Sequence, residues 1–194
     1  TGLVGVKPSV GVIAQPWGFA EPNLGISVTG ILAHDVVDAA LVFEHLRGHH
    51  PEDAYSQPVE LDDDVAAPRV AWSADLGCGF AVDADVREAF EGAVATLRAA
   101  GVTITADDPQ WPEGTREYPL LAVQQAGLAA LFGAQLDSRR ADLDPDIAAQ
   151  IEAGLGYRGA DIAALLLRRE AIVGALARFF AHHDLLLCPT APVT

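Results

Sequence analysis

Two histidines and an aspartate stand together near the end of the sequence, as His182, His183 and Asp184. Imidazole and carboxylate groups are metal ligands, so this cluster could supply a divalent ion for metal-assisted hydrolysis. Adjacent residues rarely point at one ion, however, and histidines that follow a helix are also favoured by its negative end. We therefore expect no metal at this cluster, and a metal-dependent hydrolase is a remote interpretation.

Cysteine offers a second chemistry. Cys188 follows three leucines, and a thiolate beside a histidine could attack a carbonyl group. A free cysteine at the end of an apolar strand more often packs as a small hydrophobic side chain, which is our interpretation of Cys188. Only Cys78 accompanies it, so we expect no disulfide framework and a reducing cytoplasm as the location. The other adjacent histidines, His49 and His50, precede Pro51 and are interpreted as exposed loop.

The charge balance excludes several classes of partner. The 194 residues include 27 acidic and 12 basic side chains, for a formal net charge of −15. Such a field repels phosphates, which argues against nucleic acid or an anionic membrane as a partner. The acidic run Asp62–Asp64 lacks the spacing of a calcium loop and is interpreted as a solvated loop. No apolar run approaches the ~20 residues of a membrane span, and no cofactor is expected.

The elements that would position these residues alternate between helix and strand. Residues 1–13 should form two short extended pieces around a turn at Pro8. Apolar spacing and stop signals predict helices over residues 36–43, 83–100, 118–136, 147–155 and 160–181. Strands are predicted at 69–73, 102–106 and 185–188, the first and the last of them buried. The strand, helix and strand from residue 69 to residue 106 imply a parallel crossover. The predicted class is α/β, a mixed β-sheet core flanked by helices.

Three stretches of the sequence resemble the amidase signature family of serine hydrolases, in the order expected there. They are TGLVGVKPSVG at 1–11, ISVTGILAHDVVDAALVFEHLRGHHPED at 26–53 and RREAIVGALARFFAHHDLLLCPTAP at 168–192. The strand and helix between them fit the same pattern, so the resemblance covers nearly the whole chain.

The resemblance implies acyl transfer by a serine that a lysine activates, with backbone N–H groups stabilising the oxyanion. In the family, the nucleophilic serine, a second serine in a cis peptide and the lysine would all fall before residue 1. Lys7 matches a structural Lys-Pro motif instead. No serine of this chain has the Gly-Gly-Ser setting of the nucleophile; the five are Ser9, Ser27, Ser56, Ser73 and Ser138. We therefore assign no catalytic residue, and expect residues 1–194 to be the middle-to-C-terminal portion of one amidase domain, inactive alone.

The resemblance also implies one substrate-binding residue. Arg169 aligns best with an arginine that binds the substrate carboxylate in the A subunits of glutaminyl/asparaginyl amidotransferases, a role that suits its fork of donors. The alternative is an ion pair on a helix surface, with Asp161 or Glu170.

Two functions from different classes follow. One is a portion of an amidase that hydrolyses a carboxylic amide through a serine acyl-enzyme. The other is a non-catalytic amidase-like domain, or an amidotransferase A-type subunit that works with a partner. The expected partners are a small amide substrate and the remainder of the amidase chain, and a homodimer is left open.

Overall fold

The computed structural model describes residues 2–16, 21–23, 25–60 and 67–193. The chain divides into two compact units, the first made of residues 1–62 and 119–162 and the second of residues 63–118 and 163–194. The predicted loop at Asp62–Asp64 lies outside the described residues. Within the described ranges, every helix is too short or too polar to cross a membrane.

The first unit contains two strands and most of the helices. Its elements are β1 (Val4–Val6), β2 (Ile31–Ala33), α1 (Val36–Leu46), α3 (Leu120–Phe132), the 3-10 turn η1 (Gly133–Gln135), α4 (Leu136–Arg139), the 3-10 turn η2 (Arg140–Asp142) and α5 (Pro145–Leu155). The second unit contains β3 (Val70–Trp72), α2 (Ala84–Ala99), β4 (Ile104–Ala106), β5 (Leu185–Leu187) and most of α6 (Gly159–Phe180). Each helix predicted from the sequence is present, with ends that differ by a few residues.

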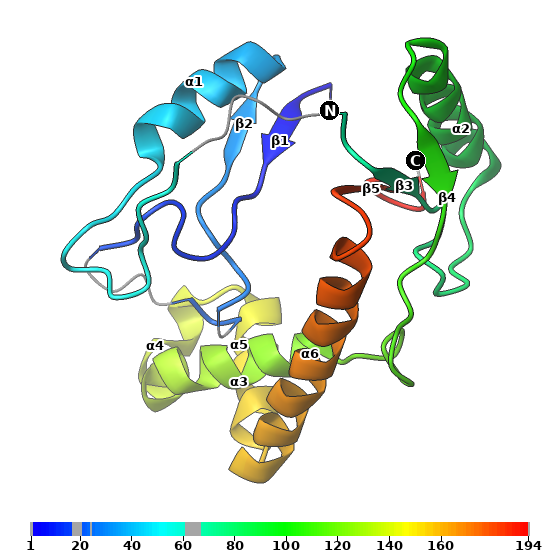
Figure 1. The fold of residues 1–194 in the computed structure, drawn as a ribbon. Helices are drawn as coiled ribbons and strands as arrows, with labels where there is room; N and C mark the ends of the chain where they lie inside the picture. The colour runs from blue at the N-terminus through cyan, green and yellow to red at the C-terminus, as the bar shows by residue number, and fades with distance from the viewer. Residues whose placement is uncertain (1, 17–20, 24, 61–66, 194) are drawn as a thin grey trace. The chain divides into compact units, whose positions relative to one another are not determined.

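In the first unit, α1 packs on an antiparallel pair of strands (Figure 1). Ile31 of β2 and Ala39 of α1 are buried together, because the helix turns only one side to the strands. Asp35 caps the helix, and its carboxylate accepts a hydrogen bond from the backbone N–H of Asp38 at 2.9 Å. The opposite side of α1 is also apolar, and Val37 there is 77% exposed.

A second cluster of the first unit lies where α3 and α5 pack closely (Figure 1). Ile151 is fully buried there, beside Leu128. Gly154 permits the close approach, because a Cβ atom at this position would lie 2.0 Å from the carbonyl oxygen of Gln125. Any larger residue would push the two helices apart.

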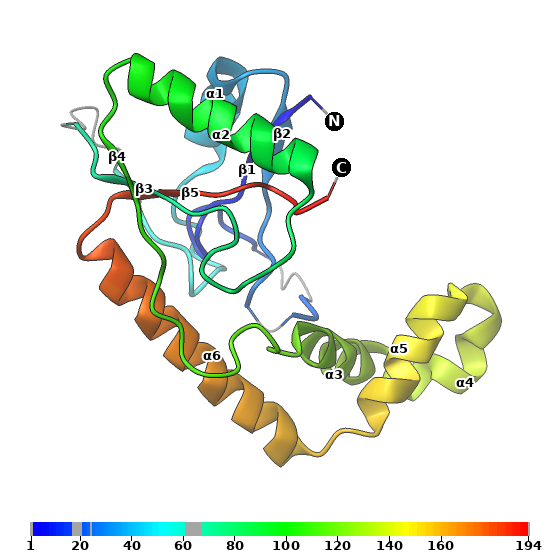
Figure 2. The same ribbon diagram turned by 90° about the vertical axis from the view of Figure 1, so that its right-hand side faces the viewer.

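The second unit is built on a parallel three-stranded sheet with the order β4-β3-β5. Val70 of β3 lies opposite Ile104 of β4 and Leu185 of β5. The parallel pairing of β3 with β4 confirms the predicted crossover. Helix α2 joins these two strands and runs along one face of the sheet (Figure 2), where Val94 is buried against Val70 and Ile104. The α/β class is confirmed, with an antiparallel pair and a parallel sheet as its strands.

The prediction that residues 185–188 form a buried strand is wrong about burial. Leu185 is 48% exposed, and Leu186 and Leu187 are only partly buried. The reason is the strand order, since β3 occupies the centre of the sheet and β5 an edge. Three leucines in a row indicate a strand, but they do not indicate its place in the sheet.

Candidate functional site

The serines and the single lysine do not form a catalytic group among the described residues. Lys7 donates to the backbone carbonyl of Pro8 at 3.3 Å, and it hydrogen-bonds no serine hydroxyl in the described part of the chain. The hydroxyl of Ser138 donates to the carbonyl of Gln135 at 3.1 Å. Ser73 is buried at 4% exposure, and its hydroxyl has no hydrogen-bond partner among the described residues. These contacts leave no lysine to take a proton from a serine.

One serine does contact a histidine, a pair that was not predicted from the sequence. The Oγ atom of Ser56 lies 3.1 Å from Nδ1 of His49. The same oxygen lies 2.8 Å from the carbonyl oxygen of Asp53 and accepts from the N–H of His50 at 2.9 Å. Ser56 is 7% exposed, so its hydroxyl is enclosed by the turn and has no room for a substrate carbonyl. Its bonds therefore hold the loop after α1, and the turn residues around Pro51 were the available signal.

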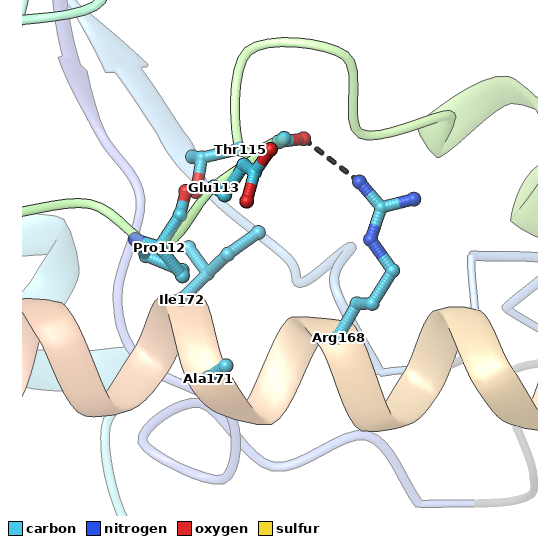
Figure 3. Close-up of a pocket in the computed structure, with 7 residues that line it drawn as sticks. Pro112, Glu113, Thr115, Arg168, Ala171 and Ile172 are labelled. Atoms are coloured by element: carbon cyan, nitrogen blue, oxygen red, sulfur yellow. Dashed lines mark hydrogen bonds between the residues drawn. The ribbon is translucent and has the colours of Figure 1, made fainter.

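Helix α6 carries two adjacent arginines, and the first of them lines a small cavity of the second unit. The cavity holds about 110 Å³ and lies between Arg168 and Ile172 of the helix and the loop at residues 112–115 (Figure 3). Arg168 reaches across it, and its Nη2 atom donates to the carbonyl of Gly114 at 2.8 Å. The guanidinium also lies 5.8 Å from the ring centroid of Tyr118, within range of a cation–π interaction.

The same loop is held to the helix from its other end. The hydroxyl of Tyr118 donates to the carbonyl of Leu165 at 3.1 Å, and the N–H of Tyr118 donates to the carbonyl of Thr115. Gly114 has a φ of +76°, and a Cβ atom there would lie 2.9 Å from Nη2 of Arg168. Arg168 thus serves as a structural link between α6 and the loop, and a cavity of this size admits only a few atoms.

Arg169, the substrate-binding candidate from the sequence, lies half-buried on α6. Arg169 is not among the described residues that line the cavity beside Arg168. Asp161, one of its two suggested ion-pair partners, pairs instead with Arg158, at 2.7 Å between Oδ1 and Nη2. A carboxylate-binding role for Arg169 stays a prediction.

The cluster of His182, His183 and Asp184 is divided between two different partners. Nε2 of His183 lies 2.7 Å from Oδ2 of Asp107, and the His183 ring packs on Phe179 with centroids 4.5 Å apart. The hydrogen bond from His183 lowers the pKa of Asp107 below its usual range. Asp184 instead binds Arg69. No group of three potential ligands within the described ranges could hold a metal ion.

The Asp107–His183 pair borders a cavity of about 240 Å³ in the second unit. An aspartate that orients a histidine is one component of acid–base catalysis. The other lining residues are Asp108, Gln110, Ala175, Arg178, Phe179 and His182. None of them offers a hydroxyl, thiol or amine nucleophile, so the cavity lacks the group that a histidine would activate.

Cys188 is not the packed residue that the sequence suggested. It follows the edge strand β5 and is exposed, because no further element of the described chain covers that side of the strand. Partial desolvation by the surrounding atoms nevertheless raises the pKa of its thiol. A raised pKa keeps the thiol protonated at neutral pH, which disfavours a role as nucleophile.

Comparison with known sequences gives consistent matches. A family model described as Amidase matches residues 1–194. The A subunit of the glutamyl-tRNA(Gln) amidotransferase of Thermosynechococcus vestitus is 27% identical over 223 residues, which covers 100% of this chain and 46% of that protein. The protein of the same name from Anaeromyxobacter sp. (strain K) is 33% identical over 168 residues, covering 80% of this chain and 34% of the relative. The chain therefore spans less than half the length of these curated relatives.

Solved structures share the fold. A bacterial aryl acylamidase, described as belonging to the amidase signature enzymes, matches 99% of this chain with a TM-score of 0.79 and 21% identity, over 42% of its own chain. A 6-aminohexanoate cyclic dimer hydrolase complexed with substrate matches 94% of this chain with a TM-score of 0.74 and 22% identity, over 41% of its own. At these identities the likeness concerns the fold alone.

Proposed function

Because this chain belongs to the amidase signature family, whose model matches its whole length, we propose that it is part of an enzyme that hydrolyses a carboxylic amide. The nucleophile is a serine that lies outside residues 1–194. Two observations support this proposal. The chain matches less than half the length of its curated relatives, and the described residues contain no serine–lysine contact. Residues 1–194 then supply scaffold and part of the wall of the substrate pocket, as the middle-to-C-terminal portion of the amidase domain.

The proposed reaction has two steps. The serine oxygen bonds to the amide carbonyl carbon, the carbon–nitrogen bond breaks, and the amine leaves with a proton from the lysine that had deprotonated the serine. Water then bonds to the ester carbonyl carbon, the bond to the serine oxygen breaks, and the carboxylic acid is released with the serine hydroxyl restored. Backbone N–H groups around the carbonyl oxygen would stabilise the oxyanion, by about 2.7–4 kcal/mol per donor.

The test uses the natural gene product. Ammonia release from benzamide and acetamide would measure hydrolysis, and labelling with a fluorophosphonate followed by peptide mass spectrometry would locate the nucleophile. We expect ammonia release and a label on a serine outside residues 1–194. A label on Ser56, or on any other serine of this chain, would contradict the placement of the nucleophile.

A second function is favoured by the names of the curated relatives, which are amidotransferase A subunits. If the gene product releases ammonia only from glutamine, and only together with partner subunits, this second function replaces the first. If the gene product releases ammonia neither alone nor together with partner subunits, the remaining interpretation is a non-catalytic amidase-like domain.

A further inference from the structure

A third cavity of the second unit lies at the carboxyl ends of β3 and β5. It holds about 310 Å³, between the loop that follows β3 and the segment that follows β5. Open α/β sheets bind their ligands at this end of their parallel strands. The cavity is also at the lower end of the size range of ligand pockets, which is about 300–1,000 Å³. Position and size both indicate a binding site for a small group.

The loop on one side of the cavity has a fixed conformation. The Asp75 carboxylate accepts hydrogen bonds from the N–H groups of Gly77 at 3.0 Å and Gly79 at 3.1 Å. Leu76 adopts a φ of 59°, and its carbonyl accepts from Nε1 of Trp111 at 2.5 Å. Two turn bonds and a tryptophan therefore hold the wall of the cavity in place before any ligand arrives, which reduces the entropy lost on binding.

A backbone hydrogen bond connects this loop with the opposite wall. The N–H of Asp83 donates to the carbonyl of Pro192 at 2.8 Å, so the segment after β5 closes the cavity on its far side. The wall there contributes Pro189 and Pro192, whose rings are rigid and apolar. The two walls thus come from segments about 110 residues apart in the sequence, near positions 80 and 190.

The lining restricts the chemistry of the ligand. Leu76, Phe80 and Val82 present apolar side chains, and Phe80 is 40% exposed. Arg116, which is not among the lining residues, lies over the Phe80 ring, with 5.4 Å between the guanidinium carbon and the ring centroid. Asp75 supplies the only charge among the described lining residues, and it is negative, as is the chain as a whole. The described lining therefore offers an anionic ligand no cation to pair with, whereas an uncharged aryl or short alkyl group fits.

We infer that this cavity binds the uncharged aryl or short alkyl group of the amide substrate. The inference rests on the proposed function for the identity of the ligand, and on the geometry above for the site. It assigns substrate selection to the loop at residues 74–82 and to the segment at 188–192.

Binding can be measured without catalysis, because Cys188 lines the cavity and is exposed. The natural gene product is alkylated with iodoacetamide at pH 8.5, and the modified peptides are quantified over time. Acetophenone serves as the probe, since it carries an aryl ketone and has no carbon–nitrogen bond to hydrolyse. At ten times its dissociation constant it should slow alkylation of Cys188 about tenfold. Cys78, which is outside the lining, is the internal control and should react at an unchanged rate.

Benzoate, which has the same ring with a negative charge, is the comparison ligand. It should not protect Cys188 at the same concentration. Equal protection by both ligands, or no protection by acetophenone, would overturn the inference.

A filling variant then tests the cavity in catalysis. Ala191 lies exposed at the rim, so Ala191→Trp adds bulk to the cavity without disturbing a packed position. This variant should raise KM for benzamide at least tenfold and KM for acetamide much less, because a methyl group needs less of the cavity than a phenyl ring. Ala95→Trp, on the exposed side of α2 and away from the cavity, is the matched control. Equal changes for both amides would remove the selective role.

The two proposals fail separately. If the gene product hydrolyses no amide but acetophenone protects Cys188, the proposed function falls and the apolar site stands. If amides are hydrolysed and Cys188 is not protected, the function stands and the site falls.

Discussion

Arg69 and Asp184, 115 residues apart, form a bidentate ion pair at the start of β3 and β5. Nη2 of Arg69 donates to Oδ1 of Asp184 at 2.7 Å, and Nε donates to Oδ2 at 3.1 Å. The backbone N–H of Arg69 also donates to Oδ2 at 2.8 Å, and the N–H of Asp184 donates to the carbonyl of Arg69 at 2.8 Å. The pair therefore fixes the register of the edge strand on the central strand.

This pair makes the second unit sensitive to acid. The hydrogen bonds from Arg69 lower the pKa of Asp184 from 3.8 to about 2. A lowered pKa stabilises the folded state above pH 4, and that contribution is lost as the pH falls toward 2. Asp184→Asn should reduce the urea midpoint at pH 7, and the difference from wild type should shrink steadily between pH 4 and pH 2.5.

Asp161→Asn is the matched control for this measurement. Asp161 pairs with Arg158 three residues away, so its loss breaks only a local contact. Because both pairs are exposed, the effect of either variant is modest. If Asp161→Asn lowered the urea midpoint as much as Asp184→Asn does, the Arg69–Asp184 pair would contribute no more than a local ion pair.

Replacing either of two helical glycines with alanine should change the free energy of unfolding, in opposite directions. Gly154→Ala places a Cβ atom 2.0 Å from the carbonyl oxygen of Gln125 and 2.8 Å from the Cβ of Ala129, so α3 and α5 must separate. We expect a loss of about 1–3 kcal/mol in the free energy of unfolding. Gly92→Ala, in the middle of α2 with open space around the added atom, should raise it by about 0.5–1 kcal/mol. Calorimetry of both variants checks the signs, and a neutral Gly154→Ala would contradict the close packing.

We predict that Ser56 stabilises the fold and does not act as a nucleophile. Its buried hydroxyl holds the turn through His50 and Asp53, so Ser56→Ala removes the acceptor of the His50 N–H and one donor to the Asp53 carbonyl. We expect a loss of about 1–3 kcal/mol in stability by urea denaturation, with kcat for amide hydrolysis unchanged. A fall in kcat of a thousandfold or more, in a variant that still folds, would instead make Ser56 a nucleophile with His49 as its base.

Replacing each of the two adjacent arginines of α6 with alanine should have a different effect, one on substrate binding and the other on stability. If Arg169 binds a substrate carboxylate, Arg169→Ala raises KM for an anionic amide such as succinamate by tenfold or more and leaves KM for acetamide unchanged. Arg168→Ala removes the link to Gly114 and should lower the thermal midpoint, with equal effects on both amides. Equal losses on both amides in Arg169→Ala would remove the carboxylate role.

Local patterns predicted most elements of this chain. Apolar spacing and the glycine at 101 indicated α2, and the alternation around Ile104 indicated β4, because these signals lie within a few residues of each other. The crossover rule then gave the parallel pairing of β3 with β4.

Features that depend on distant residues were not predictable in the same way. Cys188 was expected to pack, but its exposure follows from the edge position of β5, which is set by which strand occupies the centre. Likewise, nothing near Gly154 indicates that Gln125 approaches it, since the contact arises only when α3 and α5 pack. The apolar cavity joins two segments about 110 residues apart, and each alone has the sequence of an ordinary loop.

The edge position of β5 has a consequence for assembly. In the described chain β5 pairs with β3 alone, so the N–H and C=O groups of its outward side remain available to another extended segment. Leu185 and Leu187 turn backbone groups toward β3, so within β5 only Leu186 presents its N–H and C=O outward. The charged Asp184 precedes the strand, and Pro189, which has no N–H, follows it closely. Another strand can pair with this edge of β5. The edge is too short, and too closely flanked by a charge and a proline, to template amyloid-like growth.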